Sequence, residues 1–238
     1  MHGPDVLIDT PEESAWQVDR LDPRRIQAVL YSHWHPDHTQ GRRMFELRNV
    51  DWRTWPPELR TGDTTPVYVT EHVAADFRAR IGIWEHLEFM AGVQRTIDLH
   101  VVPDDAPIEL DGAVVTPIRL AEDEVDAFLF EGGGRRVLIA MDELNNWRPP
   151  DLGPLDLAVL PFGICELDPF TGERLIDAEH PVIAAEATYP ETLEILTRLE
   201  VAQVVLTHFE HGDGLSHDEL VRLGERDRWT PAYDGLLV

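Results

Sequence analysis

Short apolar runs rich in β-branched residues recur along the chain and predict β-strands. Each run has the length of a strand that is buried on one or both faces. The runs are Val6–Ile8, Ala28–Tyr31, Val67–Val69, Val114–Ile118, Ala127–Phe130, Val137–Ala140, Leu157–Leu160 and Val204–Leu206. Glycines at 112 and at 132–134 lie beside such runs, so we expect β-hairpins at both places.

Three segments between these runs predict helices. They are Glu71–Ile81, Thr192–Leu199 and Ser216–Arg222. The second places its leucines on one side of a helix, and the third opens with Ser216 and Glu219 at the spacing of a capping box. Strands mixed with helices predict a layered α/β fold.

The sequence gives no sign of a boundary between domains. No internal repeat or long linker is visible, so we expect a single domain over residues 1–238. The stretch 42–65 is rich in proline and tryptophan, and it predicts an irregular insertion anchored by Trp52 and Trp55. Together with Trp84, these tryptophans are candidate walls for an apolar substrate.

Charge excludes several classes of partner. Lys and Arg total 20 and Asp and Glu total 45, which gives a net charge of −25. A surface with this much negative charge repels nucleic acids and anionic lipids. We therefore expect neither a nucleic-acid nor a membrane partner. No apolar run is long enough to span a bilayer and no signal-like segment opens the chain, so we expect a cytoplasmic protein.

The one cysteine, Cys165, excludes an internal disulfide framework and has no obvious paired base, so we expect it to be a small buried side chain.

The segment Tyr31–Gly41 carries the clearest chemical signal. It places His33, His35, Asp37 and His38 within six positions, directly after a predicted strand. Imidazole and carboxylate are ligands that borderline divalent ions prefer, and without a cation these groups would be poorly paired. Alternation points His33 and His35 toward one ion, whereas Asp37 and His38 lie beyond the turn and can face a second. We therefore predict a metal site here rather than a solvated loop.

Other polar residues follow predicted strands and have two interpretations each. His208 and His211 lie at and after the end of one strand; His208 is a predicted ligand, and His211 is either a ligand or a loop residue. Asp142 follows the run Val137–Ala140 and either bridges two cations or caps a turn. Asp9, at the end of the first strand, has the same two interpretations.

These motifs resemble the metallo-β-lactamase superfamily of metallohydrolases. His33-x-His35-x-Asp37-His38 is similar to its signature, Asp142 to its bridging aspartate, and His208 to its last histidine ligand. The resemblance implies a four-layer αββα sandwich. Members of the family usually have further strands before the one that corresponds to Val6–Ile8. We therefore expect either that the first sheet has a short edge or that further residues precede Met1. The segments Phe209–Asp218 and Ala232–Gly235 resemble the subgroup of phosphoribosyl cyclic-phosphate phosphodiesterases.

The resemblance also implies a set of ligands and one departure from the family. A further family histidine is expected after Leu120, but the sequence there reads Ala121-Glu122-Asp123. Either Glu122 replaces this histidine or nothing does, and a glutamate ligand shifts the preferred metal toward Mn²⁺ or Fe²⁺. One ion would be held by His33, His35 and Glu122, and another by Asp37, His38 and His208, with Asp142 shared. The implied cofactors are Zn²⁺ or Mn²⁺, as one or two ions, with Fe²⁺ as a further candidate.

The predicted function is hydrolysis of a small anionic phosphodiester of the cyclic-phosphate type by a metal-activated water. Asp37, His211 and His180 are the predicted catalytic residues, with a histidine as proton donor to the leaving group. The alternatives are a thioester, lactone or amide hydrolase at the same site, or a metal-binding accessory protein with little turnover. A short first sheet edge also suggests a homodimer.

Overall fold

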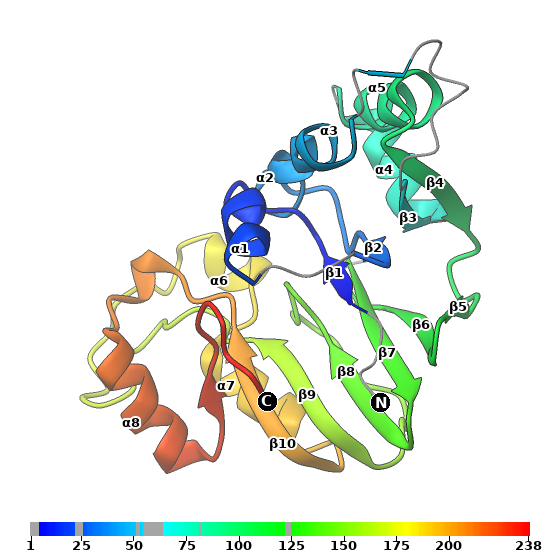
Figure 1. The fold of residues 1–238 in the computed structure, drawn as a ribbon. Coiled ribbons are helices and arrows are strands. Elements are labelled where there is room, and N and C mark those ends of the chain that lie inside the picture. The colour runs from blue at the N-terminus through cyan, green and yellow to red at the C-terminus, as the bar shows by residue number, and fades with distance from the viewer. Residues whose placement is uncertain (1–4, 22–25, 51–52, 55–63, 81, 122–124) are drawn as a thin grey trace. The chain divides into compact units, whose positions relative to one another are not determined.

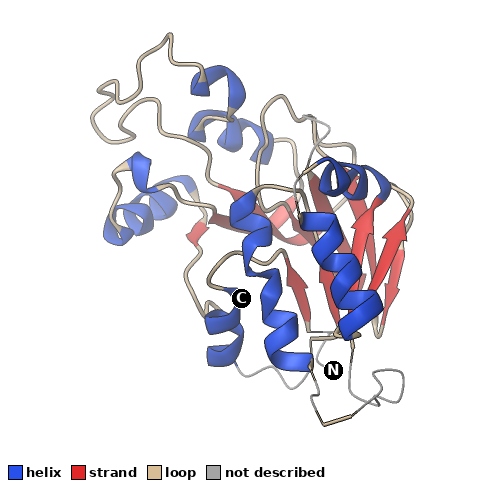
Figure 2. Ribbon diagram, turned by 90° about the horizontal axis from the view of Figure 1, so that it is seen from above, coloured by secondary structure: helices blue, strands red, loops and turns tan. Residues whose placement is uncertain are grey.

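The computed structural model describes residues 5–21, 26–50, 53–54, 64–80, 82–121 and 125–238 (Figure 1). The chain forms two compact units, Met1–Pro117 and Ile118–Val238. Both units combine strands with helices, and the strands form two sheets, so the predicted α/β class is confirmed (Figure 2). The single domain predicted over 1–238 stays a prediction.

The first unit contains a parallel sheet in which the described strands have the order β1-β2-β3-β4. These strands are β1 (Val6–Ile8), β2 (Ala28–Leu30), β3 (Thr65–Thr70) and β4 (Ile97–Val102). All three residues of β2 are buried, as expected of a strand with parallel neighbours on both sides. Because β1 and β2 are parallel, the loops that follow them begin at the same edge of the sheet. These two loops carry Asp9 and His33.

Helices follow the strands of the first unit. They are α1 (Ser14–Leu21), α2 (Pro36–Thr39), η1 (Gln40–Arg43), α3 (Met44–Asn49), α4 (Glu71–Ala79), α5 (Ile83–Glu88) and the π-helix η3 (Phe89–Gln94). Tyr31, Phe45 and Phe77 are fully buried among them. The rings of Tyr31 and Phe77 meet edge to face with centroids 5.4 Å apart. The end of β2 is therefore fixed by core packing.

A hairpin leads from the first unit toward the second. Its strands β5 (Ile108–Leu110) and β6 (Ala113–Arg119) are antiparallel, and Leu110 pairs with Ala113. This register leaves a two-residue turn in which Gly112 has a φ of +84°, a left-handed conformation that glycine adopts without strain. The hairpin predicted at Gly112 is confirmed. Strand β6 then carries the chain into the second unit.

The strands of the second unit have the order β11-β10-β9-β8-β7 among the described residues. They are β7 (Asp126–Gly132), β8 (Arg135–Ile139), β9 (Leu155–Pro161), β10 (Val201–Thr207) and β11 (Thr230–Pro231). The β7–β8 pair is the second predicted hairpin, and the other neighbours are parallel. Since β8 and β10 both run parallel to β9, the loops after them begin at one edge. These loops carry Asp142 and His208.

The helices of the second unit lie between its strands along the chain. They are α6 (Val182–Ala185), α7 (Tyr189–Leu196), the 3₁₀ turn η4 (His211–Asp213) and α8 (His217–Asp227). The capping box predicted at Ser216 and Glu219 is present. A second box, formed by Thr188 and Glu191, starts α7 three residues before the predicted Thr192. The indole of Trp229 donates a hydrogen bond to the Tyr189 hydroxyl (3.0 Å) and packs in the core beneath α7 and α8.

The structure corrects the sequence prediction in two places. Within the stretch 42–65, residues 44–49 form helix α3, and Met44 and Phe45 are buried, so this part is not irregular. Trp52 and Trp55 lie outside the described residues. Strand β4 and helices α1 and α5 were not predicted, although Ile97 to Val102 has the apolar content of a strand. Within the described chain, no helix has the length and apolar character needed to cross a membrane.

Candidate metal centre

The first group of donors lies on the loop after β2 and in helix α2, which follows it. His33 and Ser32 are buried directly after β2, and Pro36 starts α2 immediately after His35. The His33 ring lies 4.5 Å from the His35 ring and 4.2 Å from the His38 ring, measured between centroids. The Nε2 atom of His38 lies 3.3 Å from a carboxylate oxygen of Asp37. The four predicted donors of this motif therefore lie close together in space.

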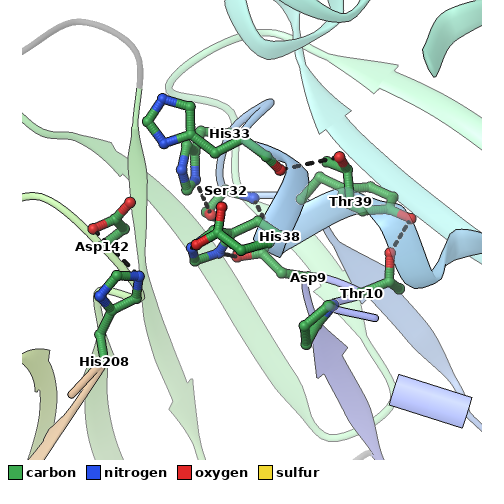
Figure 3. A network of polar contacts seen from close by, with 12 residues as sticks. Asp9, Thr10, Ser32, His33, His38, Thr39, Asp142 and His208 are labelled. Atoms are coloured by element: carbon green, nitrogen blue, oxygen red, sulfur yellow. Dashed lines mark hydrogen bonds and ion pairs between the residues drawn. The ribbon is translucent and has the colours of Figure 1, made fainter. Parts of the chain in front are cut away.

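Asp9 fixes the orientation of two of these imidazoles (Figure 3). Its carboxylate is buried and accepts hydrogen bonds from the Ser32 amide (2.7 Å), the Ser32 hydroxyl (2.6 Å) and Nδ1 of His38 (2.8 Å). Because a carboxylate only accepts, the proton of His38 is on Nδ1. The Ser32 hydroxyl gives its single proton to Asp9, so its contact with Nδ1 of His33 (2.9 Å) makes that nitrogen a donor too. A neutral ring with its proton on Nδ1 carries its lone pair on Nε2, which for His38 lies beside the Asp37 carboxylate, where a cation would offset the repulsion between the two acceptors.

This arrangement fits a divalent cation. Metal-binding histidines are held by a protein acceptor on one nitrogen and bind the ion through the other, and here Asp9 and Ser32 supply that support. Asp9, His33 and His38 offer donor atoms within 4.8 Å of one another. Neither interpretation of Asp9 from the sequence, a bridge or a turn residue, included these hydrogen bonds. Asp9 accepts from His38 and Ser32, and Ser32, which sequence reasoning missed, links it to His33.

The backbone is strained where these side chains are presented. Asp9 has a φ of +60° and His208 a φ of +55°, values that side chains other than glycine adopt rarely and at a cost. Such conformations persist only where the surroundings determine them, and they cluster at functional sites. At Asp9 the surroundings include hydrogen bonds from the backbone amides of Asp9 to Leu30 and of Thr10 to His38.

Gly41 ends the motif and lets two segments approach closely. Its amide donates to the Thr10 carbonyl (2.7 Å), and a Cβ at this position would overlap the Pro11 carbonyl oxygen. We predict that Gly41→Ala lowers the free energy of unfolding by about 3 kcal/mol, since backbone atoms cannot rotate out of the way. Urea unfolding with excess chelator measures this. Gly92→Ala is the matched control, because a Cβ there meets nothing within 4 Å; equal stability of the two variants would contradict the prediction.

The second group of donors lies in the second unit. Asp142 and His208 follow β8 and β10, and an Asp142 carboxylate oxygen lies 3.7 Å from Nε2 of His208 (Figure 3). The same oxygen accepts a hydrogen bond from the Glu143 amide (2.7 Å), which is the turn role that the sequence left open. Nδ1 of His208 lies 3.7 Å from Glu210. The structure thus pairs a carboxylate and an imidazole from two distant stretches of sequence.

A carboxyl pair that the sequence did not indicate supports the Asp142 turn. Burial, together with a hydrogen bond to Glu186, raises the pKa of Glu143 to about 9. Glu143 is therefore protonated at neutral pH and shares its proton with Glu186. Its carboxyl also accepts from the amides of Asn145 and Ala187. The turn after β8 is thereby tied to the segment before α7.

The other predicted site residues lie on exposed loops or outside the described residues. His180 is exposed, and its Nδ1 accepts a hydrogen bond from the Val182 amide (3.2 Å). His211 is exposed at the start of η4, three residues after His208. Glu122 falls outside the described residues. The assignment of His180, His211 and Glu122 stays a prediction.

Cys165 is buried, as the sequence predicts. Burial and the negative charges of Asp213 and Asp168 raise the pKa of its thiol to about 12. We expect alkylation by iodoacetamide at pH 8 to be at least about 100-fold slower in the native protein than in urea, because the thiolate is the reacting form. The alkylation rate followed by mass spectrometry tests this, and similar rates in both states would contradict it.

A family model described as "Beta-lactamase superfamily domain" matches residues 3–209. The chain belongs to this family. The superfamily predicted from the sequence is therefore confirmed. A comparison with curated protein sequences gives no match.

Several solved structures share the fold of this chain. A diphosphatase from the PhnP family is 22% identical, with a TM-score of 0.64 over 97% of this chain and 77% of that one. Zn²⁺-bound PqqB from Methylobacterium extorquens is 17% identical and has a TM-score of 0.62. The match covers 97% of this chain and 80% of PqqB. The short form of human tRNase Z is 16% identical and has a TM-score of 0.61. The match covers 100% of this chain and 89% of the tRNase Z chain. Family membership and the His/Asp cluster support a metal-dependent hydrolase and a divalent metal as cofactor, without specifying the substrate or the ion.

Proposed function

We propose that this protein is a divalent-metal-dependent phosphodiesterase that acts on a small phosphodiester of the cyclic-phosphate type. The observation that carries the proposal is the Asp9–Ser32 network, which presents Nε2 of His33 and His38 as lone-pair donors in a chain of the β-lactamase superfamily. The fold shared with a PhnP-family diphosphatase supports phosphorus as the attacked atom.

The proposed ligands come from both units. His33, His35, Asp37 and His38 of the first unit would hold two ions together with Asp142 and His208 of the second, and Glu122 is the proposed replacement for the expected family histidine. When bound, divalent ions act as Lewis acids that make water a stronger nucleophile and offset negative charge in the transition state. The support for shared ions is the donor chemistry of each group and membership of the family.

The chain's own residues have separate tasks in this proposal. Asp9 and Ser32 keep His33 and His38 in one tautomer and one orientation, which avoids a cost of reorganisation. Asp37 and Asp142 supply carboxylates that offset cationic charge. His211 or His180 donates a proton to the leaving alkoxide, a role that suits an imidazole near neutral pH.

The acidity of the chain is compatible with an anionic substrate. A net charge of −25 slows the approach of anions, but the local charge at the site decides binding. Cations held by the histidines would make the local field positive where the substrate binds. We therefore expect the rate of association to rise with salt, as screening weakens the long-range repulsion.

The deciding experiment combines metal analysis with a substrate panel. Protein purified without chelators is analysed for Zn, Mn and Fe, then assayed with bis(p-nitrophenyl) phosphate, a thioester and a lactone with each of these metals. Two equivalents of metal with phosphodiester turnover support the proposal. Turnover with only the thioester or the lactone overturns the phosphodiester assignment. One tightly bound ion with no turnover indicates a metal-binding accessory protein.

A further inference from the structure

A cavity in the first unit lies beside the histidine motif. Its volume is about 380 Å³, and its lining includes Trp34, Thr39, Arg42, Ala79, Arg80 and Ile83. We call it the Trp34 cavity. Pockets of a few hundred Å³ are large enough for small molecules. Of the tryptophans suggested as substrate walls, Trp84 packs against the core instead, beneath Arg78.

Trp34 belongs both to this cavity and to the motif. Its ring meets the His35 ring edge to face, with centroids 4.6 Å apart. The Arg80 guanidinium lies over the indole, 3.8 Å from its centroid. A molecule in the cavity therefore lies close to the candidate metal ligand His35, with an aromatic and aliphatic wall formed by Trp34, Ala79 and Ile83.

Two arginines of the cavity have no carboxylate partner among the residues that the structure describes. Acidic residues outnumber arginines more than twofold, and at least eight other arginines in the described residues form ion pairs with Asp or Glu. Arg42 instead donates to Nδ1 of His86 (3.1 Å) and to the Thr39 carbonyl (2.9 Å). Within the described residues, no group accepts a hydrogen bond from the Arg80 guanidinium, and its Nε is buried.

The geometry of Arg80 suits an anion. A guanidinium stacked on an aromatic face keeps its N–H donors in its own plane, where carboxylate or phosphonate oxygens bind bidentately. Arg42 is anchored by three hydrogen bonds and has five donors, so it also has donors to offer. Burial lowers the pKa of Arg42, which means that its charge is partly desolvated and that an anion would stabilise it.

We propose that the Trp34 cavity binds a small organic anion, whose charged group pairs with Arg80 and Arg42 and whose flat apolar body packs on Trp34 and Ile83. This binding site goes beyond the hydrolytic reaction and does not require it. If the proposed function holds, the cavity accommodates an anionic aromatic or otherwise flat part of the substrate, next to His35.

Phenylphosphonate is a suitable probe, because it combines a dianion with a flat ring and cannot be hydrolysed as an ester. Its Kd is measured by isothermal titration calorimetry on the protein as purified, beside methylphosphonate and benzyl alcohol. We expect phenylphosphonate to bind at least about 10-fold more tightly than either fragment, since it alone uses both the ring wall and the arginines. Methylphosphonate reports the affinity of the charged group without the ring wall, whether that group binds the arginines or metal ions.

A matched pair of arginine variants localises the binding. Arg80→Gln is expected to weaken phenylphosphonate binding about 10-fold or more. Arg78→Gln is the control, because Arg78 makes the same kind of contact with Trp84, 4.0 Å from its centroid, but does not line the cavity. We expect its Kd to equal that of the wild type. Circular dichroism verifies that both variants are folded.

The results separate this inference from the proposed function. An unchanged Kd in Arg80→Gln, equal affinity for methylphosphonate, or a wild-type Kd above about 10 mM would overturn the anion-binding cavity. Turnover of bis(p-nitrophenyl) phosphate in the same preparations tests the hydrolase separately. Arg80-dependent binding without turnover would keep the cavity and refute the phosphodiesterase.

Discussion

His35→Ala is expected to lower hydrolysis of bis(p-nitrophenyl) phosphate by about 10³-fold or more while leaving the protein folded. The loss corresponds to about 4 kcal/mol of activation free energy, the scale of charge stabilisation that a bound cation supplies. His35 is half-buried, and its ring packs against His33 and Trp34, so its removal costs less stability than loss of a core residue. Steady-state kinetics with parallel elemental analysis measures both effects.

The matched control is His100→Ala, in the same unit. His100 pairs with Asp98 on the exposed side of β4, and we expect its activity to match the wild type. Asp142→Ala tests the second unit, and it is expected to lose both activity and bound metal if the two donor groups share ions. Wild-type turnover with undiminished metal in either His35→Ala or Asp142→Ala would refute the proposed ligand set.

Asp9→Asn is expected to weaken metal binding by about 10- to 100-fold while changing stability much less. The amide that replaces the carboxylate can donate to Nδ1 of His38, which moves the imidazole proton to Nε2 and blocks that nitrogen as a ligand. The hydrogen-bonding positions stay filled, so the fold loses little. Metal affinity is measured by competition with a chromophoric chelator. Wild-type affinity in Asp9→Asn would show that Asp9 does not set the tautomer.

Asp9→Ala separates the two tasks of this residue. It leaves the Ser32 amide and hydroxyl and Nδ1 of His38 without their buried acceptor. We expect the free energy of unfolding to fall by about 3–5 kcal/mol, measured in urea with excess chelator. Asp19→Ala, which removes an exposed ion pair with Arg48, is expected to cost less than about 1 kcal/mol. Equal losses in the two variants would contradict the buried network.

The motif was predictable because its residues are close in sequence. Three histidines and an aspartate within six positions constrain the chemistry whatever the rest of the chain does. Most strands were predictable for a similar reason, since burial between parallel neighbours requires continuous apolar runs. Strand β4 was missed because Asp98 and His100 interrupt its apolar residues. Helix α3 was missed because Met44 and Phe45 are two apolar residues in a charged context, and only their packing shows which face is buried.

The roles of Asp9 and Ser32 were not predictable in the same way. Asp9 lies 29 residues from His38, and nothing in the sequence distinguishes a metal ligand from the acceptor that orients one. The parallel pairing of β1 with β2 brings the two loops to one edge of the sheet, where the carboxylate meets both Ser32 and His38. The Trp34 cavity is similar, because Arg80 reaches Trp34 from the end of another helix.

By itself, the sequence determined the superfamily and the α/β class, and it predicted the histidines and aspartates of the metal site, because local spacing and apolar periodicity are properties of neighbouring residues. Only the tertiary structure showed that Asp9 accepts hydrogen bonds from His38 and Ser32, that Ser32 also contacts His33, and that Arg80 stacks on the Trp34 indole. Those roles depend on which donor faces which acceptor across distant segments. Such contacts are fixed by strand register and core packing, which a linear pattern does not specify.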